Sequence, residues 1–177
     1  MSFDRCTSDY LLTDSSFGRG RCSMFITTKG RYALRVLLYL ADRYGLESVS
    51  LKKIAADEEI SLKYLEHIMS TLVQQGFVKS TKGSKGGYSL AQPPSACSVG
   101  KILRALENDL CLVPCLDEEL NPCKRADRCT TIEVWKLLQD TINELIDNLT
   151  LLDLLRMQQD KLHKPSLYLT YLMHHAE

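Results

Sequence analysis

Long hydrophobic runs are missing from this 177-residue sequence. No apolar stretch approaches the roughly 18–20 residues that a membrane-spanning helix requires. The first 23 residues contain only the short run Tyr10-Leu11-Leu12, and they lack the basic and then apolar arrangement of a secretory signal. We therefore expect a cytoplasmic protein that has no membrane partner.

Arrangements of residues that would support catalysis are missing as well. The sequence contains no Ser/His/Asp or Cys/His constellation typical of a nucleophilic enzyme, and no glycine-rich phosphate loop. Its histidines lie mainly in the tail, where His174 and His175 are adjacent. These absences argue against an enzyme.

The sequence also has no excess of charge, because 22 Lys and Arg residues balance 22 Asp and Glu residues. The charges are nevertheless unevenly distributed. Residues 24–92 contain ten basic and six acidic residues, whereas residues 93–177 contain nine basic and thirteen acidic residues. A basic first half and an acidic second half predict an anionic partner for the first half.

Residues 24–76 have the pattern of three helices. The apolar spacing predicts a helix from Lys29 to Tyr44, a short helix capped by Ser50, and a third helix capped by Ser61. The residues of the third helix predicted to form a buried apolar stripe are Leu62, Leu65, Met69, Leu72 and Val73. Its polar residues and Tyr64 are expected on the opposite side.

The stretch FVKSTKGSKGGYSLA follows, with β-type residues on both sides of a tip rich in lysine and glycine. This pattern predicts a β-hairpin. Three helices and a hairpin with a basic tip are typical of a winged helix-turn-helix, so we expect a mainly α fold with a small β-hairpin wing. Residues 61–75 would be the recognition helix.

A recognition helix of this kind predicts a double-stranded DNA operator as partner. The predicted DNA-contacting residues are Lys63, Tyr64, Glu66 and His67 on the helix and Lys82 and Lys85 on the wing. The helix residues would meet base edges, except Tyr64, which would touch phosphate, and the wing lysines would contact the DNA backbone or minor groove. The same apolar pattern also fits a helix-turn-helix that serves only as a protein-interaction module.

A helical pattern returns at Ser98, which caps a short predicted helix, and a long helix is then predicted from about Thr130 to Asn148. Apolar residues recur along the long helix at alternating spacings of three and four: Trp135, Leu138, Ile142 and Leu145. This heptad pattern is typical of a helix that packs against another helix. Because the helix lies far along the chain from the first core, we expect it to pair with a second subunit in a homodimer rather than to fold back.

Four of the seven cysteines lie in the loop CLVPCLDEELNPCKRADRC, at Cys111, Cys115, Cys123 and Cys129. Thiolates are the usual ligands of iron–sulfur clusters, and a loop allows several sulfurs to converge on one point. Structural zinc sites usually contain cysteine pairs about two to four residues apart. Only Cys111 and Cys115 meet that rule, so zinc is less favoured than an iron–sulfur cluster.

These patterns divide the chain into five segments. Residues 1–23 are polar without periodicity, and we expect a disordered N-terminal extension in which Cys6 and Cys22 are exposed thiols. The other expected segments are a winged helix-turn-helix domain at 24–92, a linker helix and cysteine-rich cluster-binding loop at 93–129, a dimerisation helix and following helical segment at 130–160, and a C-terminal tail at 161–177.

The stretches TTKGRYALRVLLYLA, ISLKYLEHIMSTLVQQGFVKSTKGSKGGYSLA and VGKILRALE resemble the IscR/NsrR/CymR superfamily of bacterial regulators, the Rrf-two superfamily. The resemblance covers about residues 24–155. It implies a homodimeric winged-helix repressor or activator with the long helix as dimer interface. It also implies DNA contacts by Lys63, Glu66, His67 and Lys82, the last standing where IscR has an arginine that enters the minor groove.

The resemblance further implies a 2Fe–2S cluster. Cys115, Cys123 and Cys129 match the three cluster-binding cysteines of the family, with two extra residues in the first gap. The leading interpretation is therefore a DNA-binding transcriptional regulator that senses iron–sulfur status, redox state or nitric oxide through this cluster. The alternatives are a cofactor-free regulator of the same family, controlled by thiol oxidation or a partner protein, and a zinc-stabilised protein-interaction adaptor.

The fourth cluster ligand does not follow the family pattern. Some relatives use a histidine at the position that is Ile132 here, and others take an acidic side chain of the opposite subunit from the position that is Arg31 here. The candidates left by the sequence are Cys111, one helical turn before Cys115, and Glu133.

Overall fold

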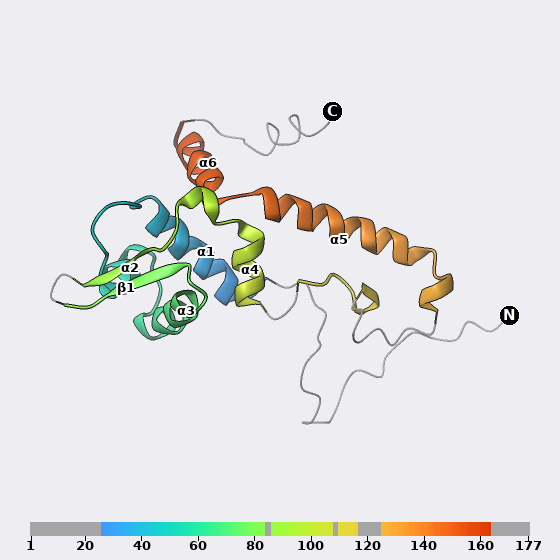
Figure 1. Ribbon diagram of the computed structural model, residues 1–177, viewed down its shortest axis with the longest axis horizontal. Helices are drawn as coiled ribbons and strands as arrows, with labels where there is room; N and C mark the ends of the chain where they lie inside the picture. Colours follow the sequence, from blue (N-terminus) through green and yellow to red (C-terminus); the bar gives the residue numbers. More distant parts are fainter. Residues whose placement is uncertain (1–25, 84–85, 108–109, 117–124, 164–177) are drawn as a thin grey trace, which may run out of the picture.

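The computed structural model describes residues 26–83, 86–107, 110–116 and 125–163. These segments are mainly helical with one two-stranded hairpin, which confirms the expected fold class (Figure 1). The α-helices are α1 (Thr28–Ala41), α2 (Leu51–Asp57), α3 (Leu62–Gln74), α4 (Val99–Leu106), α5 (Thr131–Asn148) and α6 (Leu151–His163). The other elements are the strands β1 (Val78–Thr81) and β2 (Gly87–Leu90) and the 3-10 turns η1 (Pro94–Ala96), η2 (Pro114–Leu116) and η3 (Ala126–Arg128).

The described residues leave out several segments named by the sequence patterns. The expected N-terminal extension, with Cys6 and Cys22, lies outside them, as does most of the expected C-terminal tail. Within the described segments, no helix is long and apolar enough to cross a membrane.

Side-chain caps begin most of the helices that the sequence predicts. The hydroxyls of Ser50 and Ser98 each accept a hydrogen bond from a backbone N–H three residues later, at 3.3 Å, which confirms both as caps. Thr27 caps α1 in the same way. Ser61 occupies the N-cap position of α3, but its side chain makes no capping hydrogen bond, so that part of the prediction is wrong.

Helix α1 is shorter than its apolar pattern predicts. It ends at Ala41 instead of Tyr44, because the backbone N–H groups of Arg43 and Tyr44 bond to carbonyls only three residues back, as in a tight turn. Gly45 then adopts a φ of 84°, which reverses the chain toward α2.

The buried apolar stripe of α3 is narrower than predicted, and it includes Ile68. Its buried side chains are Leu65, Ile68, Met69 and Leu72. Leu62 and Val73 are exposed by 38% and 36%, so placing them in the stripe was wrong. A helix turns by about 100° per residue, which puts these two at the flank once Ile68 joins the stripe.

The wing is fixed at its base to the loop before α2. Strands β1 and β2 pair antiparallel, with Val78 opposite Leu90. The backbone of Val49 exchanges two hydrogen bonds with Tyr88 of β2, at 2.9 and 2.8 Å. Gly87 is required at this crossing, because a Cβ there would lie 2.5 Å from the carbonyl oxygen of Val49.

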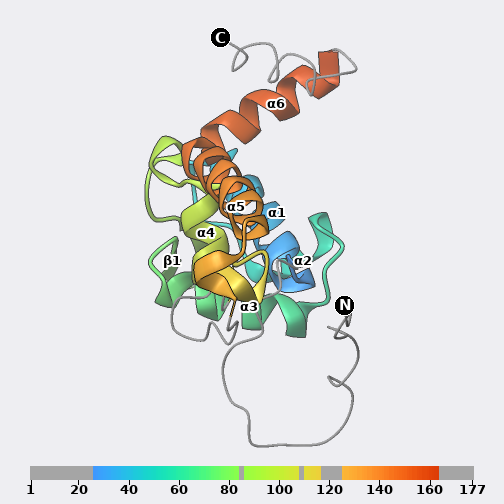
Figure 2. The ribbon, with the colours of Figure 1, turned by 90° about the vertical axis from the view of Figure 1, so that its right-hand side faces the viewer.

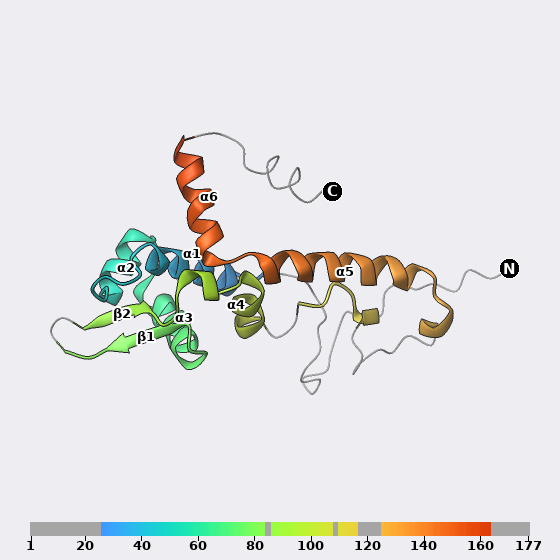
Figure 3. The ribbon, with the colours of Figure 1, turned by 45° about the horizontal axis from the view of Figure 1, so that its top comes forward.

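One hydrophobic core joins the first helices to the last. Its fully buried side chains include Leu37 of α1, Leu72 of α3, Ile102 of α4 and Leu151 of α6. Helix α6 turns away from the end of α5, as the two turned views show (Figures 2 and 3), and it contacts α1. The helical segment after α5 is therefore part of the same core as the first three helices.

Helix α5 is anchored near its C-terminal end and extends away from the lobe (Figure 1). Ile146 and Leu149 pack against Val99 and Leu103 of α4. The expectation that this helix does not fold back on its own subunit is therefore wrong for its last turns, since these reach the core through α4.

Candidate functional site

The first two turns of α3 present a polar face to solvent. Lys63, Glu66 and His67 are exposed. The neighbouring Leu65 and Ile68 are buried in the core. The spacing of three and four residues places the three polar side chains on one side of the helix. The structure thus brings together the three residues predicted to meet base edges.

Tyr64 lies differently from its predicted place on the polar side of α3. It is half-buried, and its ring packs edge-on against Tyr32 of α1, with centroids 5.9 Å apart and planes at 79°. The Arg35 guanidinium lies 5.5 Å from the Tyr32 ring and pairs with Glu58 at 3.1 Å. Tyr64 therefore anchors the start of α3 to α1, and its phosphate contact stays a prediction.

The wing carries exposed basic groups beside α3. Lys79 on β1 and Lys82 just after it are both exposed. Lys85 lies outside the described residues. Lys82 thus has the accessibility that a contact with DNA requires.

Helix α5 has two faces of different character, and the first is apolar and exposed. Its large exposed side chains are Val134, Trp135, Leu137, Leu138 and Leu145, exposed by 37–68%. Three of these belong to the predicted heptad, whereas its fourth member, Ile142, is half-buried within the subunit. A run of exposed apolar side chains along one helix is typical of an interaction surface.

The second face of α5 is a polar row, defined as Gln139, Asn143 and Asp147, and it faces α4 and the residues after α4. Arg104 of α4 donates to Asn143 Oδ1 and to Asp147 Oδ2, each at 3.0 Å. The hydrogen bonding from Arg104 to the Asp147 carboxylate holds the pKa of Asp147 below its ordinary value. The row was not predicted from the sequence, although polar residues at a spacing of four are its visible signal.

Glu107, at the end of α4, forms hydrogen bonds to the start of α1. Its Oε1 accepts from the backbone N–H of Thr27 at 3.0 Å and from the Thr27 hydroxyl at 2.8 Å. Gly30 leaves room for the carboxylate, because a Cβ there would lie 2.3 Å from Oε1. Glu107 is buried, so its hydrogen bonds are screened little by water.

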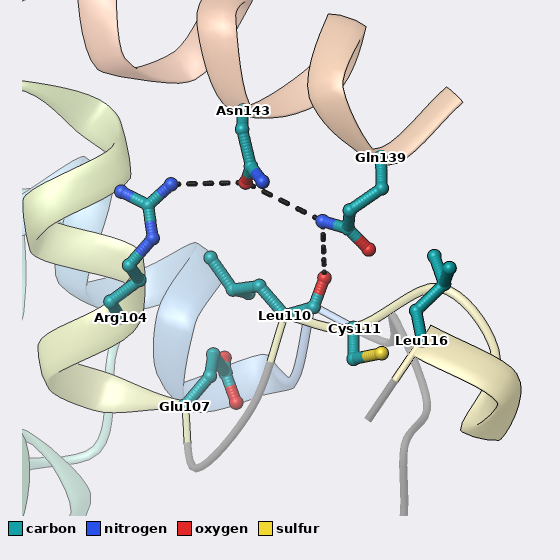
Figure 4. A pocket seen from close by; sticks show the side chains of 7 residues that line it. All are labelled: Arg104, Glu107, Leu110, Cys111, Leu116, Gln139 and Asn143. Carbon is teal, nitrogen blue, oxygen red and sulfur yellow. Dashed lines mark hydrogen bonds between the residues drawn. The ribbon is translucent and has the colours of Figure 1, made fainter. Parts of the chain in front are cut away.

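A pocket of about 370 Å³ lies between α4, α5 and residues 110–116 (Figure 4). Its lining residues are Arg104, Glu107, Leu110, Cys111, Leu116, Gln139 and Asn143. The pocket therefore sits where Cys111 meets the polar row of α5.

The described cysteines of the loop lie at both of its ends. Cys111 is half-buried, and its thiol donates to the Val113 carbonyl at 3.1 Å. Cys115 is in the turn η2, which lies against α5. Cys129 directly follows η3, one residue before the N-cap of α5. Cys123 lies outside the described residues.

Cys129 has an environment that favours its thiolate. Its sulfur lies 3.1 Å from the Thr131 hydroxyl, and this hydrogen bond is the main cause of a pKa below the ordinary value for a thiol. Backbone N–H groups of Ile132 and Thr131 and the charge of Arg125 lower the pKa further. Cys97 shows the opposite behaviour, because burial in the core raises its pKa.

A 2Fe–2S cluster requires soft, deprotonated sulfur ligands. The donor chemistry fits, since Cys129 favours the thiolate and Cys115 sits in a turn rather than inside a helix. Among the residues that the structure describes, no three His, Cys, Asp or Glu side chains form a group that would hold a metal ion. Cys115 and Cys129 would thus need a ligand from residues 117–124, where Cys123 lies.

The positions considered for a fourth ligand are occupied as follows. Ile132 is buried in the first turn of α5. Arg31 is exposed and donates to Thr28. Glu133 is exposed, and the Lys136 ammonium pairs with it at 3.1 Å. Cys111 is the candidate that lines the pocket.

The family follows from the comparison of this sequence with known families. The model of the Rrf2 family, described as iron-dependent transcriptional regulators, matches residues 26–157. The chain belongs to the Rrf2 family. Members of this family are transcriptional regulators and not enzymes, in agreement with the absence of catalytic motifs from the sequence.

Rrf2 relatives of two kinds are similar to this chain. The regulator CymR of Bacillus subtilis is 40% identical over 131 residues, which cover 74% of this chain and 89% of CymR. The regulator IscR of Yersinia enterocolitica is 36% identical over 135 residues, covering 76% of this chain and 81% of IscR.

Solved structures of the same two kinds of regulator are similar to this chain. CymR of B. subtilis, described as the global cysteine regulator, superposes with a TM-score of 0.64 at 38% identity, covering 75% of this chain and 97% of CymR. IscR of T. potens superposes with a TM-score of 0.63 at 33% identity, covering 83% of this chain and 96% of IscR. The winged-helix assignment is therefore confirmed.

The environment of Cys129 gives a test by thiol reactivity. In protein stripped of metal with a chelator, the rate of Cys129 alkylation should rise with pH through a midpoint below that of an ordinary thiol, because only the thiolate reacts. Thr131→Val removes the hydroxyl and should move the midpoint upward, so that alkylation at neutral pH becomes slower. Thr141→Val is the matched control on the same helix, and peptide mass mapping measures the rates. An unchanged midpoint in Thr131→Val would contradict the assigned cause.

Proposed function

We propose that this Rrf2 protein is a homodimeric DNA-binding regulator whose operator affinity is controlled by a 2Fe–2S cluster held by Cys115, Cys123 and Cys129. The observation that carries the proposal is the place of the described cysteines. Cys115 and Cys129 both lie in the segment that connects α4 to α5, Cys115 in η2 and Cys129 directly before the N-cap of α5. Chemistry at these sulfurs would therefore act on the connection between the lobe and α5.

Binding to DNA is supported by the exposed polar face of α3 together with the wing. Lys63, Glu66 and His67 would contact bases in the major groove, since a helix of this width fits that groove. Lys82, and Lys85 outside the described residues, would contact the backbone or minor groove and displace counterions. Tyr64 would reach phosphate only with its hydroxyl, because its ring packs on Tyr32.

Pairing of two subunits is supported by the exposed apolar face of α5. Trp135, Leu138 and Leu145 expose large apolar surfaces, and a second α5 would cover them. Two winged-helix lobes held by such a pair would address two operator half-sites about 34 Å apart. Small movements of α5 relative to its lobe would alter the fit to both half-sites.

Control by a cluster is supported by the description of the Rrf2 family as iron-dependent and by the IscR relatives. When bound, the cluster would supply a link between the ends of the cysteine loop and a site that oxidants attack. The residues of the chain position the sulfurs. Cys129 is held before α5 by Thr131, and Cys115 follows Pro114 in a turn against α5.

A second candidate function is regulation by thiol oxidation without a cofactor. It is favoured by the similarity to CymR, which is as extensive as the similarity to IscR, and one solved relative is CymR of Staphylococcus aureus in an oxidized form. The same cysteines would then act as thiols. The visible absorbance of protein purified without oxygen separates the two functions, because only a cluster absorbs there.

The dimer contact is tested by placing a charge on the apolar face of α5. Leu138→Lys should raise the dimer dissociation constant about a hundredfold or more, since an unpaired charge buried at an interface costs about 3 kcal/mol or more. Leu138 is a sharper choice than Ile142, which is half-buried within its own subunit. Asp140→Lys is the control in sedimentation velocity, because Asp140 is exposed and lies about 160° around α5 from Leu138. A dimer unaffected by Leu138→Lys would place the interface elsewhere.

The DNA contacts are tested by separating general from base-specific affinity. Lys82→Ala should weaken binding to most sequences and lower the slope of log K against log salt by about 2 per dimer, about 1 for each lysine removed. Glu66→Ala should instead relax base preference, by about 1–3 kcal/mol at the contacted pair. Fluorescence anisotropy with operator and random duplexes measures both effects. Equal effects of the two variants on both duplexes would contradict the assigned roles.

The cluster is tested by removing its ligands one at a time. Cys115→Ala, Cys123→Ala and Cys129→Ala should each abolish the visible absorbance of anaerobically purified protein. Cys97→Ala, in the hydrophobic core, is the control that should keep it. Loss in Cys111→Ala would make Cys111 the fourth ligand. A triple variant that retains stoichiometric iron and sulfide would rule the cluster site out.

A further inference from the structure

Gln139 on α5 holds the backbone on both sides of Cys111. Its Oε1 accepts from the backbone N–H of Leu112 at 2.8 Å, and its Nε2 donates to the carbonyl of Leu110 at 3.1 Å. One side-chain amide thus replaces the two hydrogen bonds that a neighbouring backbone strand would make. Figure 4 shows the amide directed from α5 to the loop.

The amide of Gln139 also connects to α4 through the polar row of α5. Its Nε2 lies 3.4 Å from Asn143 Oδ1, and the same oxygen accepts from Arg104 at 3.0 Å. The cysteine loop is therefore linked by consecutive hydrogen bonds to α5 and then to α4 (Figure 4). Hydrogen bonds in such a series strengthen one another when partly shielded from water.

An amide is required for this geometry. A carboxylate accepts but does not donate at neutral pH, an aliphatic side chain does neither, and asparagine is shorter by one methylene. Gln139 is half-buried at the edge of the pocket, where both of its polar atoms have partners. Its side chain is thus committed to the loop and not to solvent.

We propose that Gln139 is the positioning residue of the cysteine loop: it fixes Cys111 at the pocket and transmits changes in the loop to α5. The first half of this statement concerns the chain alone. The second half rests on the proposed function, because it assigns the route by which the state of the cysteines alters operator binding. Loss of the amide would leave the winged-helix lobe and the apolar face of α5 intact.

The hold on the loop is tested in the cluster-free full-length protein. Gln139→Ala should speed hydrogen exchange of the Leu112 amide roughly tenfold and speed alkylation of Cys111, because one bond to each neighbour is lost. Gln139→Glu should keep the protection of Leu112, whose N–H it still accepts, but should not restore slow alkylation of Cys111. Asp140→Ala, exposed one residue away, is the matched control and should resemble wild type.

Unchanged hydrogen exchange of the Leu112 amide in Gln139→Ala would overturn the proposal that Gln139 fixes the loop. A fall in melting temperature with faster exchange throughout the core would overturn it too, because it would indicate general loosening. These readouts need no cluster, so they decide the first half even when wild-type protein lacks visible absorbance and the proposed function fails.

The transmission is tested by the ratio of operator affinities with and without the cluster. Gln139→Ala should move this ratio toward one while DNA salt dependence and the melting temperature of the cluster-free form stay unchanged. Loss of the cluster from Gln139→Ala, but not from Asp140→Ala, at unchanged melting temperature would also support the positioning role. A wild-type ratio in a Gln139→Ala protein that holds its cluster would overturn the transmission.

Discussion

The hydrogen bonds between the Glu107 carboxylate and Thr27 are the interaction on which the placement of α4 against α1 depends. A buried carboxylate accepts two hydrogen bonds from the residue that caps α1, so the end of α4 is fixed to the start of the winged-helix lobe. Three residues earlier, Arg104 fixes the same short helix to the polar row of α5. Helix α4 is therefore bound on both sides, and the cysteine loop begins directly after it.

The two faces of α5 make different contacts. The polar row holds the helix to its own subunit, whereas the apolar face stays exposed along the part that extends beyond α4. Under either proposed mode of control, chemistry at Cys115 and Cys129 would act next to the part of α5 that extends beyond α4. Cluster ligation and thiol oxidation thus share one mechanical consequence.

Periodicity and turn chemistry were sufficient to predict the elements of the fold. Caps at Ser50 and Ser98 and the lysine- and glycine-rich tip of the wing are local signals, and the structure has a helix or the hairpin for each. Boundaries were less certain for a physical reason. The apolar pattern of α1 continues to Tyr44, but the backbone there changes its hydrogen bonding to a tight turn. Leu62 and Val73 were wrongly assigned to the buried stripe of α3, because both lie at its flank and remain partly exposed.

The sequence by itself determined the family, the winged-helix fold, the exposed polar residues of α3 and the apolar heptad of α5, because each depends on residue order within one element. Only the tertiary structure decided what depends on distant residues meeting. The ring of Tyr64 packs on Tyr32, Leu151 of α6 enters the core of the first helices, and Gln139 holds the backbone beside Cys111. None of these partners is nearer than 27 positions in the chain. No local pattern encodes such pairs, since they arise from the packing of helices that the sequence specifies one at a time.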